Sequence, residues 1–296
     1  MLKLPYSYKL LSLLLFYCSL LNAQKNTFSR SIKLPPELKE VSGMTRLPNG
    51  DLWLLNDSKN PADLFRFDPN QKKVVEVRHL NARNYDWEDL THDPAGNLYI
   101  GDFGNNYNKR QNLRIFRYNP NTGALESIPF RYPDQQAFPP ANPSTWNFNC
   151  EAMVYFQDSL HLFSKNVFKG NFYCKHYVVC AQPGAEQVAI LRDSIKLNDR
   201  VVTGAALSQD GKTLALTGYI MGKRFGIWPY TKASVMYFTD YEGTRFLRGK
   251  QRWRRLPKFG VSRQFESITQ WDPKTWIAAN EGRKPQVQRI WRLKSR

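Results

Sequence analysis

Acidic residues of the kind that bind cations open three short apolar runs of this chain. These residues are Glu88, Glu151 and Glu266. Runs of the same style end in the amide side chains of Asn56, Asn166 and Asn280. Hard carboxylate and amide oxygens suit calcium, which takes roughly six to eight oxygen ligands in its usual sites. If these side chains meet, the sequence predicts a calcium site.

The same acids allow a catalytic and a structural interpretation. A bound calcium ion would polarise the oxygen of a scissile bond, and Glu88 or Glu151 would then be the candidate general base of a hydrolase. Alternatively, each glutamate accepts hydrogen bonds from backbone N–H groups of its own or the next repeat and fixes the angle between repeats. Like charges at short range raise each other's pKa values or demand a cation, so both alternatives stay open.

A repeated hairpin must bring these residues together. Each copy has a small or acidic opening, a short apolar strand, a turn rich in Gly, Asn, Asp and Pro, and a second alternating strand. The copies span residues 41–57, 87–102, 150–166, 202–219 and 265–281. Recurrence at roughly 45–60 residues is typical of propeller blades. The chain is therefore predicted to be an all-β propeller of four-stranded blades rather than a β-sandwich.

The hairpin count favours five blades. The alternative of six blades requires a degenerate blade hidden before Cys150 or before Phe265. The last copy supplies only three strands, so residues 27–34 are predicted to complete the last blade and close the ring. Residues 24–296 are then expected to form a single domain.

Propeller geometry places the acids on one face. The start of the first strand and the end of the second strand of a hairpin lie at the same end, and first strands line the central channel. Glu88, Glu151 and Glu266 are therefore expected to converge at the channel mouth. The second strands end in further acids on the same face, namely Asp57, Asp102 and Glu281.

The histidines are not expected in this site. His92 lies with Asp93 in a hairpin turn, at the opposite end of the channel. His79, His161 and His176 fall in strand-like runs without matching partners, which favours core or surface roles. The sequence also lacks a nucleophile elbow, an H-E-x-x-H zinc motif and a phosphate loop.

Two long connections, residues 132–148 and 220–232, are predicted to emerge on the acidic face. Binding residues commonly lie on loops held by a rigid scaffold. The candidate ligand-binding residues are those that these connections carry: Trp146, Phe148, Arg224, Trp228 and Tyr230. The alternative is that the aromatic rings pack on one another as a lid or a local core.

The N-terminus indicates an exported protein. Lys3, Lys9 and the apolar run of residues 10–21 have the form of a secretory signal peptide over residues 1–23. No later segment is apolar enough to span a membrane, so the predicted location is periplasmic or extracellular. A formal net charge of +18 favours anionic partners such as an envelope surface, whereas nucleic acid is not expected for an exported protein.

The repeat resembles that of secreted bacterial propellers of the phytase-like, gluconolactonase-like and NHL/YVTN class. The stretches "VSGM", "DWEDLT", "GNLYIGD" and "FESI" carry the resemblance. Many members of the class have six blades, from which a count of five departs. The class includes calcium-dependent hydrolases and pure binding proteins.

Three functions follow as expectations from the acids, the aromatic loops and the charge. The first is an exported propeller that binds a small molecule, glycan or peptide at an acidic, aromatic-rimmed channel mouth, with calcium. The second is a calcium-dependent hydrolase of ester, lactone or phosphate bonds. The third is an envelope scaffold or interaction protein.

Overall fold

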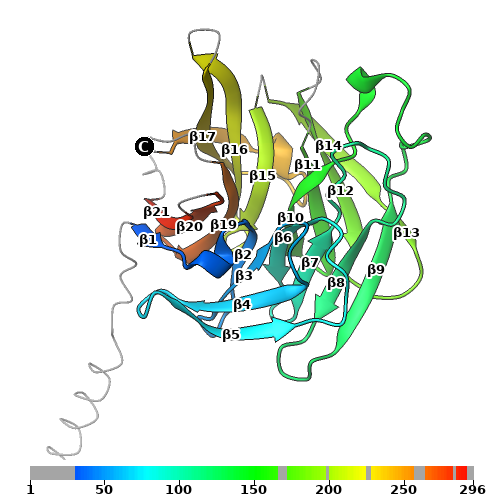
Figure 1. Cartoon of the computed structure of the whole chain (residues 1–296). Coiled ribbons are helices and arrows are strands. Elements are labelled where there is room, and N and C mark those ends of the chain that lie inside the picture. The colour runs from blue at the N-terminus through cyan, green and yellow to red at the C-terminus, as the bar shows by residue number, and fades with distance from the viewer. Residues whose placement is uncertain are drawn as a thin grey trace, which may run out of the picture.

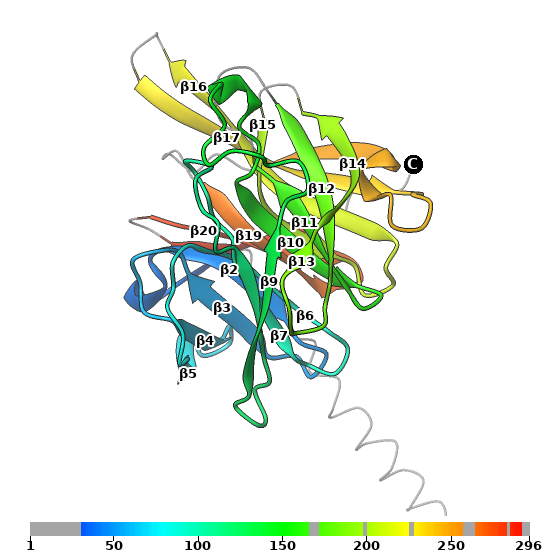
Figure 2. The ribbon, with the colours of Figure 1, turned by 90° about the vertical axis from the view of Figure 1, so that its right-hand side faces the viewer.

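The computed structural model describes residues 31–165, 172–197, 200–224, 228–256, 264–282 and 285–291. Its strands form five sheets, each with four antiparallel strands, which stand around a common centre as the blades of a propeller (Figures 1 and 2). The second sheet has a fifth strand at its edge, contributed by the third blade. The predicted all-β propeller with five blades is confirmed. The predicted signal peptide lies outside the described residues.

Consecutive hairpins build the blades. Blade 1 holds β2 (Val41–Arg46), β3 (Leu52–Asn56), β4 (Asp63–Asp68) and β5 (Lys73–His79). Blade 2 holds β6 (Trp87–His92), β7 (Leu98–Asp102), β8 (Arg114–Tyr118) and β9 (Leu125–Arg131). Blade 3 holds β10 (Cys150–Phe156), β11 (Ser159–Ser164), β12 (Tyr173–Cys180) and β14 (Ile190–Lys196).

The last two blades follow the same pattern. Blade 4 holds β15 (Arg200–Leu207), β16 (Thr213–Arg224), β17 (Trp228–Thr239) and β18 (Lys250–Arg255). Blade 5 holds β19 (Phe265–Asp272), β20 (Thr275–Asn280), β21 (Gln286–Trp291) and β1 (Ser31–Lys33). Short 3-10 turns lie at Pro36–Leu38, Pro143–Thr145 and Phe246–Arg248. The strands β16 and β17 have 12 residues each, and their hairpin projects beyond the rest of the ring (Figures 1 and 2).

The N-terminal strand closes the ring as predicted. β1 pairs antiparallel with β21, with Ser31 opposite Gln288 and Lys33 opposite Gln286. The first described residues thus supply the fourth strand of the last blade. This pairing covers a sheet edge that would otherwise stay open.

The core lies between the blades. Five clusters of buried apolar side chains each join two adjacent blades. Every residue of β3 is buried because blades cover both of its faces, whereas the outer strand β5 alternates exposed and half-buried residues before ending exposed. Near-continuous apolar runs in the second strands and alternation in the outer strands are the sequence signs of this packing.

Each innermost strand carries a β-bulge at the same place, near its start. A bulge breaks the alternation of side chains along a strand and so changes which residues face the channel. The residues inserted at the bulges of blades 1 to 5 are Ser42, Glu88, Glu151, Thr203 and Glu266. The residues that follow them are Gly43, Asp89, Ala152, Gly204 and Ser267.

Two further observations complete the fold. Cys150 and Cys174 are buried free thiols and Cys180 is an exposed one. Within the described ranges, no helix has the length and apolar character needed to cross a membrane.

Candidate functional site

The bulges place the three predicted glutamates around one mouth of the central channel. Glu88, Glu151 and Glu266 come from blades 2, 3 and 5, and all three are buried. Burial raises the pKa of each of them, and a neighbouring carboxylate raises it further, namely Glu151 for Glu88, Glu266 for Glu151 and Asp57 for Glu266. For Glu151 the pKa rises to about 8.

A lysine supplies part of the positive charge that these acids require. Lys165 follows β11, and its Nζ donates a hydrogen bond to Oε2 of Glu151. Its side chain is only 11% exposed. Burial alone would lower the pKa of Lys165, but the neighbouring carboxylates, Glu151 and Glu266 foremost, hold that pKa well above its usual value. The sequence places Lys165 at the same hairpin end as Glu151, but it did not identify the lysine as the counter-ion of the mouth.

A second group of acids lies beside Glu88. One carboxylate oxygen each from Asp57, Asp86 and Glu88 lies within 4.8 Å of the other two. Burial is the largest cause that raises the pKa of all three groups. These three acids, the acidic triad from here on, could hold a metal ion. Asp57 was predicted on this face, whereas Asp86 was missed because it precedes the strand.

Gly104 makes room for the triad. A Cβ atom on this residue would lie 2.3 Å from Oε1 of Glu88 and 2.4 Å from Oδ2 of Asp86. The backbone N–H of Gly104 donates to the carbonyl oxygen of Asp86 at 3.1 Å. The loop after β7 therefore approaches the two carboxylates as closely as a residue without a side chain permits.

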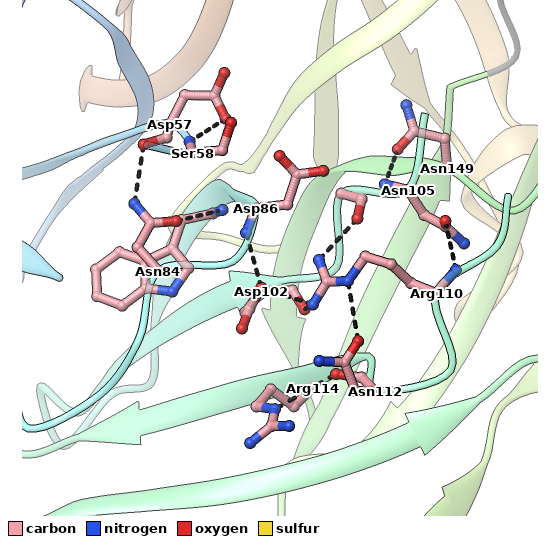
Figure 3. Close-up of polar contacts among 12 residues, drawn as sticks. Asp57, Ser58, Asn84, Asp86, Asp102, Asn105, Arg110, Asn112, Arg114 and Asn149 are labelled. Atoms are coloured by element: carbon pink, nitrogen blue, oxygen red, sulfur yellow. Dashed lines mark hydrogen bonds and ion pairs between the residues drawn. The ribbon is translucent and has the colours of Figure 1, made fainter. Parts of the chain in front are cut away.

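A network of hydrogen bonds holds the backbone at Asp57 and Asp86 in place (Figure 3). Asn84 joins blades 1 and 2, because its Nδ2 donates to the carbonyl oxygen of Asp57 at 2.9 Å and its Oδ1 accepts from the backbone N–H of Trp87 at 3.0 Å. Asp102 accepts from the backbone N–H of Asp86 at 3.1 Å and from Nη2 of Arg110 at 2.9 Å. Asp102, predicted on the acidic face, is therefore a support of the triad rather than an open carboxylate.

Glu266 and Glu281 share one amide. Nε2 of Gln264 donates to Oε1 of Glu266 at 3.1 Å and to Oε1 of Glu281 at 2.9 Å. Burial, followed by the charge of Glu266, raises the pKa of Glu281 to about 7. Glu88 differs from these acids, because no hydrogen bond from the described residues reaches its carboxylate.

The predicted amide ligands have local partners. Nδ2 of Asn56 donates to the carbonyl oxygen of Glu37 at 2.7 Å, and Nδ2 of Asn280 donates to that of Glu281 at 3.0 Å. Oδ1 of Asn56 is buried and accepts no hydrogen bond from the described residues. Asn166 lies outside the described residues.

Asp89 holds the blades together in the way the structural interpretation proposed for the glutamates. Its Oδ1 accepts the backbone N–H of Leu90 at 2.8 Å, and its Oδ2 accepts those of Met153 at 2.7 Å and Ala205 at 3.3 Å. These donors belong to blades 2, 3 and 4. The sequence shows Asp89 directly beside Glu88, but without the bulge there was no reason to separate their roles.

The predicted aromatic rim differs from residue to residue. Trp146 is half-buried, and its Nε1 donates to the carbonyl oxygen of Pro140 at 2.8 Å. Phe148 is buried in the core between blades 2 and 3. The backbones of Arg224, Trp228 and Tyr230 lie at the end of the β16–β17 hairpin, with Arg224 opposite Trp228, and their side chains are outside the description.

Two exposed tyrosines beside the triad were missed. Tyr85 is 43% exposed and Tyr107 is 68% exposed. The guanidinium of Arg83 lies 4.5 Å from the ring centroid of Tyr85, and Nζ of Lys109 lies 5.3 Å from that of Tyr107. Both tyrosines stand in connections that frame strands β6 and β7, whereas the prediction considered only the longest connections.

Two of the histidines that were expected to lack partners, His161 and His176, form a hydrogen bond with each other. Nδ1 of His161 lies 2.9 Å from Nε2 of His176, and Nδ1 of His176 lies 2.9 Å from Oδ1 of Asp193. Phe163 and Phe246 pack on this pair. The group is part of the core of blade 3, which agrees with the predicted core role but corrects the statement that the histidines have no partners.

Comparisons with known proteins find the fold only. No family model and no curated protein match the chain. Among solved structures it is similar to the PQQ-bound aldose sugar dehydrogenase of Streptomyces coelicolor, with 11% identity, 89% of this chain and 98% of that chain covered, and a TM-score of 0.49. A protein assigned as a gluconolactonase shares 13% identity over 87% of this chain and 77% of its own, with a TM-score of 0.46.

A third neighbour is longer. Hydrazine synthase of Kuenenia stuttgartiensis shares 14% identity over 82% of this chain, with a TM-score of 0.41, and this chain spans 56% of its length. The gluconolactonase belongs to the propeller class that the sequence resembles. At these levels the likeness concerns the fold and assigns no activity to this chain.

Proposed function

We propose that this protein is an exported propeller that binds an oxygen-rich ligand through calcium held at the acidic triad. The observation that carries the proposal is the triad itself, three carboxylate oxygens within 4.8 Å of one another. Carboxylates in this arrangement fit calcium, whose ligands are oxygens. Glu88, to which no described residue donates a hydrogen bond, is the strongest ligand candidate.

The electrostatics of the mouth favour the same conclusion. Burial and mutual repulsion raise the pKa of these acids, so a cation close to them would stabilise their ionised form. Lys165 lies against Glu151 and Arg110 lies against Asp102, and the pKa of each triad acid is still raised although one or both of these cations act on it. A divalent ion at Asp57, Asp86 and Glu88 would supply further positive charge there.

The ligand would complete the coordination of the ion. Three protein carboxylates leave positions for the oxygens of a small molecule, glycan or peptide. Tyr85 and Tyr107 are exposed in the connections that carry Asp86 and Gly104. Arg83, Arg110 and Lys109 lie over these rings, and the parts of the rings that they leave uncovered offer apolar contact to such a ligand. Export accords with the N-terminal sequence, and the exposed strand β18, rich in arginine, would face anionic surfaces of the envelope.

Calorimetric titration with calcium chloride tests the proposal. The wild type should bind calcium, and Asp86→Asn should weaken binding at least about tenfold, which is roughly 1.4 kcal/mol. Glu126→Gln is the matched control. Glu126 is exposed on the outer strand β9 of the same blade, where it pairs with Arg117 of β8. The calcium site would be disproved if the wild type showed no heat of binding and no calcium-dependent rise in melting temperature.

A second candidate function rests on Glu151. A buried carboxyl with a pKa of about 8 suits general acid–base chemistry near neutral pH. In a hydrolase of ester, lactone or phosphate bonds, bound calcium would polarise the scissile oxygen. In its ionised form Glu151 would take the proton of the attacking water and become neutral, and the charge of Lys165 would then be available to stabilise the oxyanion that forms at the scissile bond.

This alternative has a separate test. Glu151→Gln should abolish hydrolysis of aryl esters, lactones or aryl phosphates while leaving calcium binding within about threefold of the wild type. Calcium binding without hydrolysis of any of these compounds would leave the binding function and exclude this activity on them.

A further inference from the structure

The opposite mouth of the central channel holds a cavity of about 500 Å³. All five blades contribute to its lining, with residues that include Thr45, His92, Tyr155, Ala205 and Thr269. The cavity is formed by the ends of the innermost strands and the hairpin turns. His92 was predicted at this end of the channel, away from the acidic mouth.

Two hydroxyl groups of the lining can donate hydrogen bonds into the cavity. Oγ1 of Thr91 accepts the backbone N–H of Tyr155 at 3.2 Å, and Oγ1 of Thr269 accepts that of Arg46 at 3.3 Å. A hydroxyl that accepts a hydrogen bond keeps its own proton for donation. Both groups are fixed by these bonds between blades, so they are positioned before a ligand arrives.

A neutral histidine adds a third polar group. Nδ1 of His92 lies 2.8 Å from Oγ1 of Thr45. No hydrogen bond from the described residues reaches Nε2. Burial lowers the pKa of His92 to about 4, so the imidazole is uncharged at neutral pH and offers Nε2 as one donor or one acceptor.

The acids of the lining are already engaged. Asp93 accepts the backbone N–H of Asn97 at 2.9 Å, Nδ2 of Asn97 at 2.7 Å and the hydroxyl of Tyr99 at 3.2 Å. Oδ1 of Asp210 accepts the hydroxyl of Ser208 at 2.5 Å and the backbone N–H of Lys212 at 3.1 Å. These carboxylates accept hydrogen bonds within their own turns. We therefore expect the cavity to favour an uncharged ligand.

The remaining surface is apolar and includes two aromatic rings. Tyr155 and Phe156 line the cavity together with Leu90 and Ile268. The Tyr155 ring stacks on Tyr99, with a centroid distance of 5.5 Å and an interplanar angle of 26°. Stacking of this kind fixes the orientation of a ring that also meets the cavity.

We propose that this cavity is a second ligand site, which takes an uncharged carbohydrate of one or two sugar rings. Its volume lies within the roughly 300–1,000 Å³ of small-molecule pockets. A sugar presents hydroxyl oxygens to Thr91, Thr269 and His92, and its C–H faces to the aromatic rings. The inference does not depend on the acidic mouth, which lies at the other end of the channel.

The experiment is calorimetric titration of the full protein with cellobiose and trehalose, and with gluconate and glucosamine as charged controls. The neutral sugars are expected to bind with dissociation constants of roughly 0.1–10 mM. The charged sugars should bind at least about tenfold more weakly. Absence of binding by both neutral disaccharides, or equal binding of the charged sugars, overturns the assignment.

Variants locate the binding. Thr91→Val and His92→Phe should each weaken cellobiose at least about fivefold, whereas Thr91→Ser, which retains the hydroxyl, should not. Glu126→Gln, on the outer strand β9 and away from both mouths of the channel, should leave sugar binding unchanged, and an equal loss in this variant would refute the proposal. Should the cavity variants fold poorly, the imidazole proton signals of His92 in the wild type must move on addition of cellobiose, and unmoved signals also refute it.

Discussion

Replacing Lys165 with methionine removes the positive charge of the mouth while keeping an unbranched side chain of similar length. In the wild type, Nζ of Lys165 is bonded to Glu151 and its charge also acts on Glu266 and Glu88. Removing one partner of a buried ion pair costs about 3–5 kcal/mol. For a chain of this size, each kcal/mol corresponds to about 2–4 °C in melting temperature, so a decrease of roughly 6–20 °C is expected at pH 9, where both partners of the pair are charged.

The pH dependence of that cost is the sharper expectation. The pKa of Glu151 lies near 8 in the folded protein and near 4.5 in the absence of its neighbours. The folded state therefore keeps a proton that the unfolded state has lost, and stability falls as pH rises from about 4.5 to 8. Lys165 limits this fall. The cost of Lys165→Met should be small at pH 5, where Glu151 is protonated in the folded state, and largest at pH 9.

Urea unfolding followed by tryptophan fluorescence measures this cost at both pH values. The double variant Lys165→Met/Glu151→Gln is the control, and at pH 9 it should recover more than half of the stability lost in the single variant. A cost of Lys165→Met that is the same at pH 5 and pH 9, or below about 1 kcal/mol at pH 9, would show that the lysine does not neutralise the mouth.

Three further predictions concern the triad and the channel axis. Gly104→Ala should lower calcium affinity at least about tenfold and destabilise the fold by about 1–3 kcal/mol, because the added Cβ would overlap the Glu88 and Asp86 carboxylates. Calorimetry measures the affinity and urea unfolding the stability, and an unchanged affinity would contradict the role assigned to the glycine. Calcium affinity should rise between pH 5.5 and 7.5, because protons compete for carboxyls whose pKa is raised; titrations at the two pH values check this, and a flat profile counts against the triad as ligand set. Asp89→Ala should cost more than about 3 kcal/mol, since three buried N–H groups lose their acceptor, and Asp89→Asn, which keeps one oxygen, should cost less; the same unfolding assay decides, and equal small costs would refute the bridging role.

The sequence predicted the ring well because hairpins are local. Turn chemistry and strand alternation lie within about 17 residues of each copy, and the end at which Glu88, Glu151 and Glu266 stand follows from hairpin geometry alone. The closing strand β1 was predicted from the strand count of the last blade. These features need no knowledge of how side chains meet across blades.

What the sequence did not predict depends on bulges and on contacts between blades. A bulge inserts one residue without leaving a mark in the hydrophobic pattern, so the separate roles of Glu88 and Asp89 could not be assigned. The contact of Lys165 with Glu151 depends on the rotamer of a long side chain. Phe148 looked like a loop aromatic because its burial depends on the neighbouring blade.

The ring is also joined at its rim. β13 (Gln187–Val188), from the connection between β12 and β14 of blade 3, pairs parallel with β9 of blade 2. Blade 2 thus receives a strand from its neighbour. The two blades share a sheet at the rim as well as a core near the centre.

The residues that follow the bulges set a limit on the symmetry of the molecule. Asp89 reaches across the axis to three blades, and the equivalent residues of the other blades are Gly43, Ala152, Gly204 and Ser267. A Cβ on Gly204 would lie 2.4 Å from the carbonyl oxygen of Glu266. Five blades that all carried an aspartate at this position could therefore not share one axis, because five carboxylates would meet where four of the blades have only glycine, alanine or serine. The blades therefore differ from one another at the centre of the ring, and a consensus repeat made from this chain could not carry both the aspartate of blade 2 and the small residues of the other four blades at that position.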